Sequence, residues 1–219
     1  MYRFPVAEFK TFPKELKVLR GLRTPAAIQD FLNAMPFNFE EDGETYYSPV
    51  MVLKNKKAHC MEGAMLAATA LWLHGQQPLI MDLKTTERDV DHVVALFKEG
   101  NRWGAISKTN HAVLRYRDAI YRDPREIAMS YFNEYFLNKD GAKTLRSYSA
   151  PFDLSRYGTA WLTAKEDLDD ITIALDNSPH VNILEKGGVR HLRPAEPIEI
   201  EAGKIVEWNG TRRQNKQAK

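Results

Sequence analysis

The sequence holds a single cysteine, Cys60, at a position where a thiol can become reactive. A run of helix-forming residues begins there, and the free N–H groups and dipole at the start of a helix favour the thiolate, which is the nucleophilic form. Lys56 and Lys57 lie just upstream and add positive charge. We therefore predict a nucleophilic thiol at Cys60. The alternative is a buried, inert cysteine, which is common for this residue type.

His92 supplies the imidazole that such a thiol requires. It lies in a strand-like run at residues 91–97, and an imidazole within reach of the thiol accepts its proton and later returns it to the leaving group. A third group must hold the second ring nitrogen. The next strand-like run ends at Ser107, and Asn110 follows in the loop, so both are candidates for that role. The predicted catalytic residues are therefore Cys60, His92, Ser107 and Asn110.

A buried helix followed by a strand meander must position these side chains. The run at residues 60–74 carries small apolar residues at helical spacing, and Gly63 within it allows close backbone approach. Three strand-like runs follow at residues 78–84, 91–97 and 102–107, separated by turn sequences. This order predicts an α+β fold in which the cysteine-bearing helix packs on an antiparallel sheet.

Further elements are expected on both sides of this core. Thr24 as a helix cap and Pro25 in the first turn predict a helix that ends before Pro36. We expect one domain at residues 1–175, with its core at about 25–137, and an extension at 176–219 that ends in a basic tail. The remaining expected elements are an acidic loop at 38–48, helices at 123–136 and 164–175, a loop-rich stretch at 140–165, and a small hairpin at 197–201 and 204–208.

Length and composition are those of an ordinary globular protein. The chain has 219 residues, of which 43% are hydrophobic and 27% charged, and its formal net charge is +2. This balance gives no reason to expect nucleic acid as a partner, and no apolar run reaches the ~18 residues that a membrane span requires. The start MYRFPVAEFK lacks the apolar region of a secretory signal, so we expect a cytoplasmic protein whose thiol stays reduced.

Other polar clusters have simpler explanations than a cofactor or metal site. His92 and His111, with two nearby aspartates, raise the alternative of a metal hydrolase, but the H-x-x-x-H and H-E-x-x-H spacings of such sites are missing. Arg115 and its neighbouring arginines alternate with acidic residues, which predicts ion pairs rather than a nucleic-acid site. Glycine-rich phosphate loops are also missing. We therefore expect neither a cofactor nor a metal ion.

The segments around the cysteine and the histidine resemble a known enzyme core. In order they are AHCMEGA, AATALWLHG, QPLIMDL and DHVVALFKEGNRWGAIS, within about residues 55–110. This order resembles the core of the transglutaminase-like superfamily, a branch of the papain-like thiol enzymes. NHAVLRYRD and REIAMSYF resemble later segments of a bacterial group within that superfamily. The resemblance implies that Cys60 is the nucleophile, His92 the general base and Trp103 the family's tryptophan.

One position departs from the family pattern. Ser107 stands where the family carries an aspartate, and a serine hydroxyl accepts a hydrogen bond from imidazole but cannot stabilise imidazolium by charge. The implied activity is acyl transfer from an amide of a peptide or protein donor: a peptidase or amidase if water accepts the acyl group, a transglutaminase if an amine does. The alternative is a binding module that keeps the fold without the activity. We expect the backbone N–H of Cys60 to stabilise the oxyanion, with Asn55 or His59 as helpers.

Overall fold

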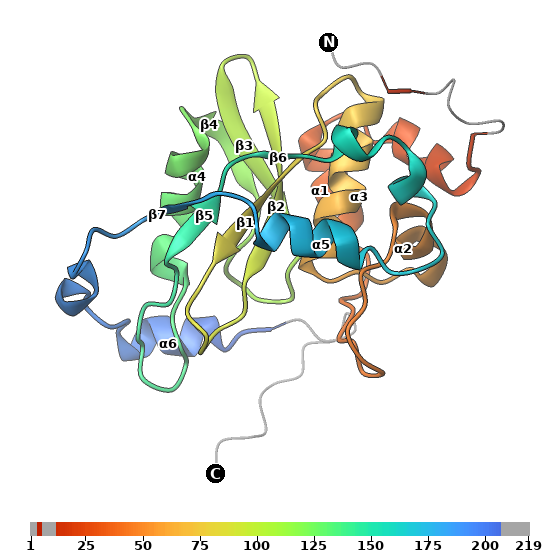
Figure 1. Ribbon diagram of the computed structural model, residues 1–219. Coiled ribbons are helices and arrows are strands. Elements are labelled where there is room, and N and C mark those ends of the chain that lie inside the picture. The colour runs from red at the N-terminus through yellow and green to blue at the C-terminus, as the bar shows by residue number, and fades with distance from the viewer. Residues whose placement is uncertain (1–3, 6–11, 207–219) are drawn as a thin grey trace.

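The computed structural model describes residues 4–5 and 12–206, and its centre is a seven-stranded antiparallel sheet. The strand order is β4-β3-β2-β1-β5-β7, and β6 also pairs with β1. Helices cover both faces of the sheet, with α1, α2, α3 and α5 toward one side and α4 on the other (Figure 1). The predicted α+β class is confirmed, and the cysteine-bearing helix α3 packs on this sheet.

The first three strands lie where the sequence predicts them. They are β1 (Leu79–Lys84), β2 (His92–Glu99) and β3 (Arg102–Ser107), and consecutive members pair as an antiparallel meander. The register brings the start of β2, at His92, beside the end of β3, at Ser107. The remaining strands are β4 (Arg117–Tyr121), β5 (Ser147–Ser149), β6 (Phe152–Asp153) and β7 (His180–Asn182).

The predicted helix caps are formed in the structure. Thr24 Oγ1 accepts a hydrogen bond from the N–H of Ala27 at 3.1 Å, with Pro25 in the first turn of α1. The α-helices are α1 (Pro25–Asn33), α2 (Pro49–Asn55), α3 (Cys60–Leu73), α4 (Pro124–Tyr131), α5 (Asp169–Asp176) and α6 (Pro197–Gly203). The 3-10 helices are η2 (Glu15–Gly21), η3 (Phe132–Glu134), η4 (Leu154–Tyr157), η5 (Ala160–Leu162) and η6 (Gly188–His191).

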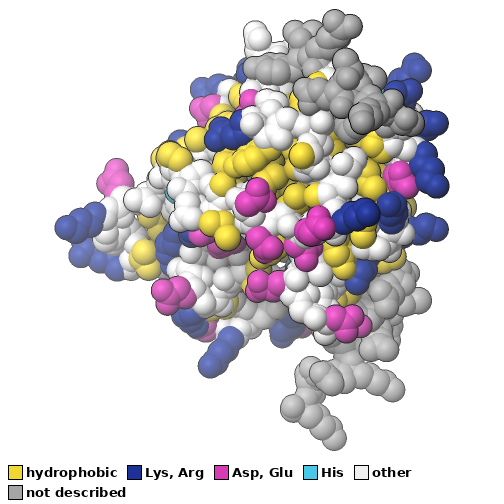
Figure 2. Space-filling model, turned by 45° about the vertical axis from the view of Figure 1, so that its right-hand side comes forward, with side chains coloured by type: hydrophobic (Ala, Val, Ile, Leu, Met, Phe, Trp, Pro, Cys, Tyr) yellow, Lys and Arg dark blue, Asp and Glu magenta, His cyan; other side chains and the backbone are white. Residues whose placement is uncertain are grey.

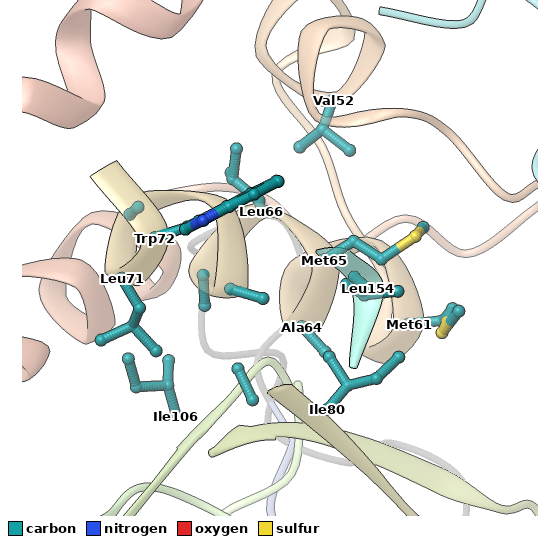
Figure 3. Packing of buried hydrophobic residues seen from close by; sticks show 14 of the residues in the cluster. Val52, Met61, Ala64, Met65, Leu66, Leu71, Trp72, Ile80, Ile106 and Leu154 are labelled. Carbon is teal, nitrogen blue, oxygen red and sulfur yellow. The ribbon is translucent and has the colours of Figure 1, made fainter. Parts of the chain in front are cut away.

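The helix α3 lies at the centre of one face of the sheet. Every residue at positions 61–72 is buried, because the sheet lies on one side of the helix and α2 on the other. Figure 3 shows Ile80 and Ile106 of the sheet below α3 and Val52 of α2 above it. A Cβ on Gly63 would lie 2.4 Å from the Cβ of Lys108, so the close approach predicted at this glycine is confirmed.

The opposite face of the sheet is covered by α4 and the chain that follows it. Ile127 and Tyr131 of α4 belong to the same buried cluster as Val94 and Leu96 of β2. The helix expected at residues 123–136 is shorter than predicted, since α4 ends at Tyr131 and the chain continues into the 3-10 helix η3. Because α4 gives way to η3, Tyr135, the residue after η3, does not continue along the axis of α4.

The hairpin predicted at residues 197–201 and 204–208 is wrong. Residues Pro197–Gly203 form α6, where Glu196 and Glu199 make a capping box and Pro197 occupies the first turn. These local hydrogen bonds favour a helix although the sequence P-I-E-I-E alternates like a strand. Residues 207 and 208 and the predicted basic tail lie outside the described residues. The domain boundary at 175 stays a prediction; β7 and α6 lie beyond it.

None of the helices in the described ranges has the length and apolar character needed to cross a membrane. The face drawn in Figure 2 carries charges of both signs, with acidic side chains gathered near its middle and many Lys and Arg side chains toward its edges. This mixture agrees with the formal net charge of +2.

Candidate active site

Cys60 lies at the N-terminus of α3, in a cleft at the end of the sheet. The cleft has a volume of about 340 Å³, and its lining includes Cys60, His92, Asn110, His111 and Tyr135. Cys60 is only partly buried, and its N–H makes no hydrogen bond with any described residue. The cleft therefore holds a thiol together with an unused backbone donor.

His92 is buried at the start of β2 and is held by the hydroxyl of Ser107. The distance from His92 Nε2 to Ser107 Oγ is 2.7 Å. The hydroxyl proton of Ser107 is donated to the carbonyl oxygen of Leu114, so the Ser107 oxygen accepts from His92. His92 therefore carries its proton on Nε2 and keeps a lone pair on Nδ1, which is the state that a general base requires.

Ser107 is fixed in turn by Gln29 of α1. The amide of Gln29 pairs with the backbone of Ser107 in both directions: Gln29 Nε2 donates to Ser107 O at 2.8 Å, and Ser107 N–H donates to Gln29 Oε1 at 2.9 Å. Gln29 is itself buried, with 6% of its surface exposed. A side-chain amide thus replaces a strand partner at the end of β3 and sets the position of the hydroxyl that holds His92.

The carbonyl that receives the Ser107 proton belongs to a residue in a left-handed conformation. Leu114 has φ 59°, a region that is unfavourable for a leucine. Its N–H donates to Glu134 Oε2 at 2.6 Å, and Glu134 Oε1 lies 2.5 Å from Arg117 Nη2. This ion pair and the Ser107 hydroxyl hold Leu114 in place, so the support of His92 extends through β3, the following loop and η3.

The pKa of the Cys60 thiol lies well below its ordinary value. Burial acts to raise this pKa, but hydrogen bonds and positive charge from His59 and His92 outweigh the effect of burial. Because Nε2 of His92 is bound to Ser107, Nδ1 is the nitrogen left for the thiol. The contribution expected from upstream lysines is not the cause: Lys56 is the exposed C-cap residue of α2, and the groups that lower this pKa are histidines.

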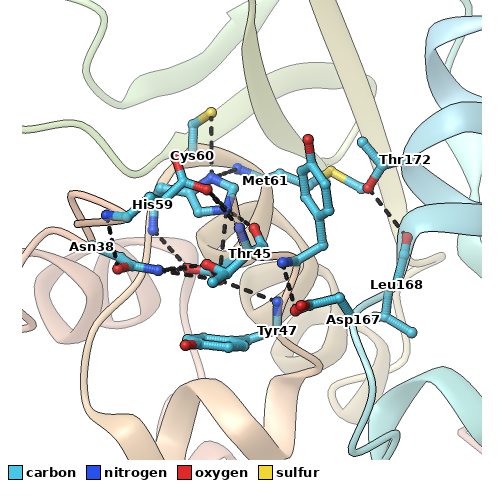
Figure 4. Close-up of polar contacts among 12 residues, drawn as sticks. Asn38, Thr45, Tyr47, His59, Cys60, Met61, Asp167, Leu168 and Thr172 are labelled. Atoms are coloured by element: carbon cyan, nitrogen blue, oxygen red, sulfur yellow. Dashed lines mark hydrogen bonds and ion pairs between the residues drawn. The ribbon is translucent and has the colours of Figure 1, made fainter. Parts of the chain in front are cut away.

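His59 is a second histidine beside the thiol (Figure 4). Its Nδ1 lies 4.0 Å from Cys60 Sγ and 3.3 Å from the backbone nitrogen of Met61, and its Nε2 lies 2.7 Å from the carbonyl oxygen of Thr45. Although burial acts to lower it, the pKa of His59 is raised to about 9 by the Cys60 thiolate, by Glu62 and by the Thr45 carbonyl. The sequence suggested His59 only as an oxyanion helper.

Glu62 is the buried anchor of this second side of the site. Its carboxylate is fully buried and accepts hydrogen bonds from Asn38 Nδ2, Thr45 Oγ1 and the N–H groups of Tyr47 and His59, at 2.9–3.3 Å. Figure 4 shows how these contacts draw the segment from Asn38 to Tyr47 against the start of α3. The acidic loop predicted at residues 38–48 is therefore partly folded onto the site rather than wholly solvated.

Three other predicted or implied site residues lie in different settings. Asn110 lines the cleft, but within the described ranges it makes no hydrogen bond with His92, whose Nε2 is taken by Ser107. Trp103 lies at the opposite end of β3, where Lys98 Nζ is 4.1 Å from its ring centroid. Asn55 is exposed at the end of α2. Asn110 is therefore not the group that holds His92, and Trp103 and Asn55 are not in the lining of the cleft.

A group of three carboxylates brings together β1, the residue before β2 and the end of α5. Asp82, Asp91 and Asp176 bring oxygens within 4.8 Å of one another, and the two cleft histidines are not part of this group. Burial and the charge of Asp91 raise the pKa of Asp82 to about 6. His180 Nε2 lies 3.1 Å from Asp82 Oδ2, and Lys84 Nζ lies 2.5 Å from Asp176 Oδ1. Two of these carboxylates thus have a partner within the chain itself, His180 for Asp82 and Lys84 for Asp176.

Tyr135, which directly follows η3, is a cleft residue that the sequence did not single out. It is 3% exposed, and its hydroxyl has no hydrogen-bond partner among the described residues. Its approach to the cleft depends on the point at which α4 gives way to η3, which residue periodicity does not reveal. Gln29 was missed for a similar reason, because its contact with Ser107 joins positions 78 residues apart.

Comparison with known proteins adds no assignment to this geometry. No protein-family model matches the chain, and no curated protein matches its sequence. The chemistry of the chain must therefore be inferred from its own residues and their arrangement.

Proposed function

We propose that this chain is a thiol-dependent acyl-transfer enzyme of the transglutaminase-like type, acting on an amide or peptide bond. The observation that carries the proposal is the arrangement around Cys60. Its thiol has a lowered pKa, and a buried histidine is held in the tautomer of a base by Ser107. An inert structural cysteine has no need of either feature.

The proposed reaction begins with proton transfer from the Cys60 thiol to Nδ1 of His92. The thiolate attacks the acyl carbonyl, and the oxyanion that forms is placed beside the unused N–H of Cys60. His92 then returns its proton to the departing amine, the carbon–nitrogen bond breaks, and a thioester remains on Cys60. Attack by water on the thioester makes the enzyme a peptidase or amidase, and attack by an amine makes it a transglutaminase.

Because position 107 is a serine, the positive charge that forms on His92 during the proposed reaction has no anionic partner there. A serine orients His92 without an ionic partner, so imidazolium at His92 is less favoured than it would be beside a carboxylate. His59 compensates on the other side of the thiol, because Glu62 and the Thr45 carbonyl favour its charged form. In this scheme charged His59 stabilises the thiolate that forms when His92 takes the thiol proton, and His92 carries that proton to the leaving group.

The pH dependence of iodoacetamide alkylation tests the proposal directly. The chain has one cysteine, so every alkylation event reports on Cys60. We expect wild type to react rapidly below pH 7, and His92→Ala to shift toward the profile of an ordinary thiol with pKa ~8.5. His111→Ala is the matched control, since it removes an imidazole from the same cleft that does not hold the thiol. Slow alkylation of native wild type at every pH below 8 would favour the non-catalytic binding module.

A further inference from the structure

Tyr135 has a buried hydroxyl without a partner, and this sets it apart from the tyrosine that precedes it by four positions. Tyr131 is fully buried, and its hydroxyl donates to the carbonyl oxygen of Arg115 at 2.8 Å. Tyr135 is 3% exposed, and its hydroxyl meets no acceptor or donor among the described residues. Buried polar groups in folded proteins nearly always have partners, and an exception calls for a functional explanation.

The unpaired hydroxyl belongs to the cleft that contains Cys60 and His92. Two charged groups lining this cleft are already engaged by the protein. Lys108 Nζ donates to the carbonyl oxygen of Leu32 at 2.9 Å, and Glu134 binds both the N–H of Leu114 and Arg117. The hydroxyl of Tyr135 and the N–H of Cys60 belong to residues that line this cleft, and neither donor has a partner within the described residues.

The hydroxyl of Tyr135 acts as a donor under all ordinary conditions. Burial raises its pKa well above the usual value, and the negative charge of Cys60 and of nearby aspartates, chiefly Asp89, adds to this effect. The phenol therefore stays protonated while Cys60 is a thiolate. The hydrogen-bond partner of this hydroxyl must therefore be an acceptor. In acyl transfer, the carbonyl oxygen of the substrate is such an acceptor, and it becomes a stronger one as it turns into an oxyanion.

We propose that the Tyr135 hydroxyl donates a hydrogen bond to the carbonyl oxygen of the acyl group attacked by Cys60, and so forms, with the Cys60 N–H, a two-donor oxyanion site. This inference rests on the proposed acyl-transfer function. It assigns Tyr135 as a catalytic residue that touches the substrate, and it assigns the substrate an uncharged acyl carbonyl. Two donors on one oxygen stabilise the tetrahedral intermediate more than the planar ground state, because the charge on oxygen is larger there.

The test compares Tyr135→Phe with Tyr131→Phe in two reactions of the same thiol. Acylation is followed as the first-turnover burst of 4-nitrophenolate from 4-nitrophenyl acetate: the sulfur–acyl bond forms and the carbon–oxygen bond breaks, and the nitrophenolate leaves with the electron pair. Alkylation by iodoacetamide is the second reaction, and it develops no oxyanion. We expect Tyr135→Phe to slow acylation by about 10²-fold or more and to leave the alkylation profile unchanged. Tyr131→Phe should leave both rates at the wild-type level.

Thermal stability provides an independent readout of the same variants. Removing an unpaired buried hydroxyl should raise the melting temperature of Tyr135→Phe, by about 2–4 °C for a chain of this size. Tyr131→Phe deletes a satisfied hydrogen bond and should lower the melting temperature.

The outcomes separate this inference from the proposed function. If Tyr135→Phe acylates as fast as wild type while wild-type alkylation is fast at low pH, the oxyanion role is overturned and the acyl-transfer proposal stands. If Tyr135→Phe loses alkylation and acylation together, the hydroxyl acts on the thiol and the assignment to the carbonyl is wrong. If the wild-type thiol is slow in both reactions, the proposed function fails, and the assignment of Tyr135 falls with it.

Discussion

Two histidines flank Cys60, and their surroundings differ in charge. His92 is bound through Nε2 to a neutral hydroxyl, 2.7 Å away at Ser107. His59 is bound through Nε2 to the Thr45 carbonyl at 2.7 Å, with Glu62 and Glu40 oxygens at 3.6 and 3.8 Å. A neutral partner leaves an imidazole ready to accept a proton, whereas nearby carboxylates favour a ring that already carries one. The comparison suggests a division of labour between proton transfer at His92 and charge stabilisation at His59.

The two histidines also differ in what protonation changes. Nδ1 of His59 accepts the N–H of Met61 and so caps α3, and this nitrogen also faces the sulfur. Protonation of Nδ1 therefore removes its hydrogen bond from the Met61 N–H, and the new N–H can donate to the thiolate instead. Nδ1 of His92 has no such structural duty within the described residues, so its protonation during a reaction leaves the fold unchanged.

The largest expected effect separates the two histidines by rate. His92→Ala should lower the first-turnover acylation rate by about 10² to 10⁴-fold, because the general acid and base is lost. His59→Gln should lower it less, by roughly tenfold for each unit that the pKa of Cys60 rises, and the loss should diminish at high pH where the thiolate forms unaided. Stopped-flow acylation by a 4-nitroanilide, whose leaving amine must be protonated, measures both across pH 6 to 10. Equal losses at pH 10 would contradict the division of labour.

The next largest effect is expected from a substitution that alters only the surroundings of His59. Glu62→Gln keeps the size of the side chain but turns one acceptor toward buried N–H groups as a donor, so we expect the free energy of unfolding to fall by about 1–3 kcal/mol. The pKa of Cys60 should rise as His59 loses its buried carboxylate. Urea unfolding and the alkylation profile measure the two effects. Glu40→Gln is the matched control: its carboxylate is 30% exposed and lies farther from the ring, so both changes should be smaller.

Coupling between Cys60 and His59 should appear as a plateau in stability against pH. Folded His59 has a pKa of about 9 against ~6.5 unfolded, so its contribution is complete below pH ~6.5 and is lost as pH rises through about 9. Folded Cys60 has a lowered pKa against ~8.5 unfolded, so its contribution is complete above pH ~8.5 and is lost as pH falls toward the folded value. The two slopes cancel between pH ~6.5 and ~8.5.

The plateau is measured as a difference between two proteins. The free energy of unfolding of wild type minus that of Cys60→Ala should be flat in this window and should decline on both sides, at most by about 1.4 kcal/mol per pH unit. Cys60→Ala removes the thiolate that raises the pKa of His59, so both flanks disappear in the variant. A difference that rises steadily from pH 6 to pH 9 would mean that His59 is not charged in the folded protein.

The smallest effect is expected from a substitution that alters only the support of His92. Gln29→Leu removes both hydrogen bonds to the backbone of Ser107 while nearly keeping the side-chain volume, and it should destabilise the protein by about 1–2 kcal/mol. Acylation should fall because Ser107 no longer fixes the tautomer of His92, and the alkylation profile should shift less than in His59→Gln because His59 still lowers the pKa of Cys60. The same two assays, with chemical unfolding, measure these changes. A shift of the alkylation profile as large as that of His59→Gln would show that the two sides are not separable.

The predictable part of the site is the part built on regular periodicity. Small residues at helical spacing placed the start of α3 at Cys60, and strand alternation placed His92 and Ser107 at facing ends of β2 and β3. Antiparallel pairing then brings those ends together, so the sequence predicted Ser107 or Asn110 as the partner of His92, and the structure has Ser107 in that contact. Whether these residues act as catalysts stays a prediction.

The part of the site and fold that the sequence does not predict depends on loops that fold back on the chain and on very short secondary-structure elements. His59 reaches its charged state through Glu62, whose partners come from a loop that the sequence marks only as acidic. The strands β5 and β6 have three residues and two residues, too few for a period to be recognised, and they lie in a stretch expected to be loop. At α6 the alternating pattern favoured a strand, and the capping glutamates overrode it.

The link between Gln29 and Ser107 also bears on the order in which the molecule assembles. The two residues are 78 positions apart, and Lys108 reaches back across 76 positions to the carbonyl oxygen of Leu32 near the end of α1. Consider a chain that has formed α3 and the sheet but has not yet docked α1. In it Gln29 does not hold the backbone of Ser107, and Ser107 therefore does not fix the orientation of His92. Long-range contacts of this kind form slowly because the intervening loop must close first. In the proposed mechanism, full acylation activity therefore requires that the first and second quarters of the chain have met, and its recovery during refolding would report when α1 docks.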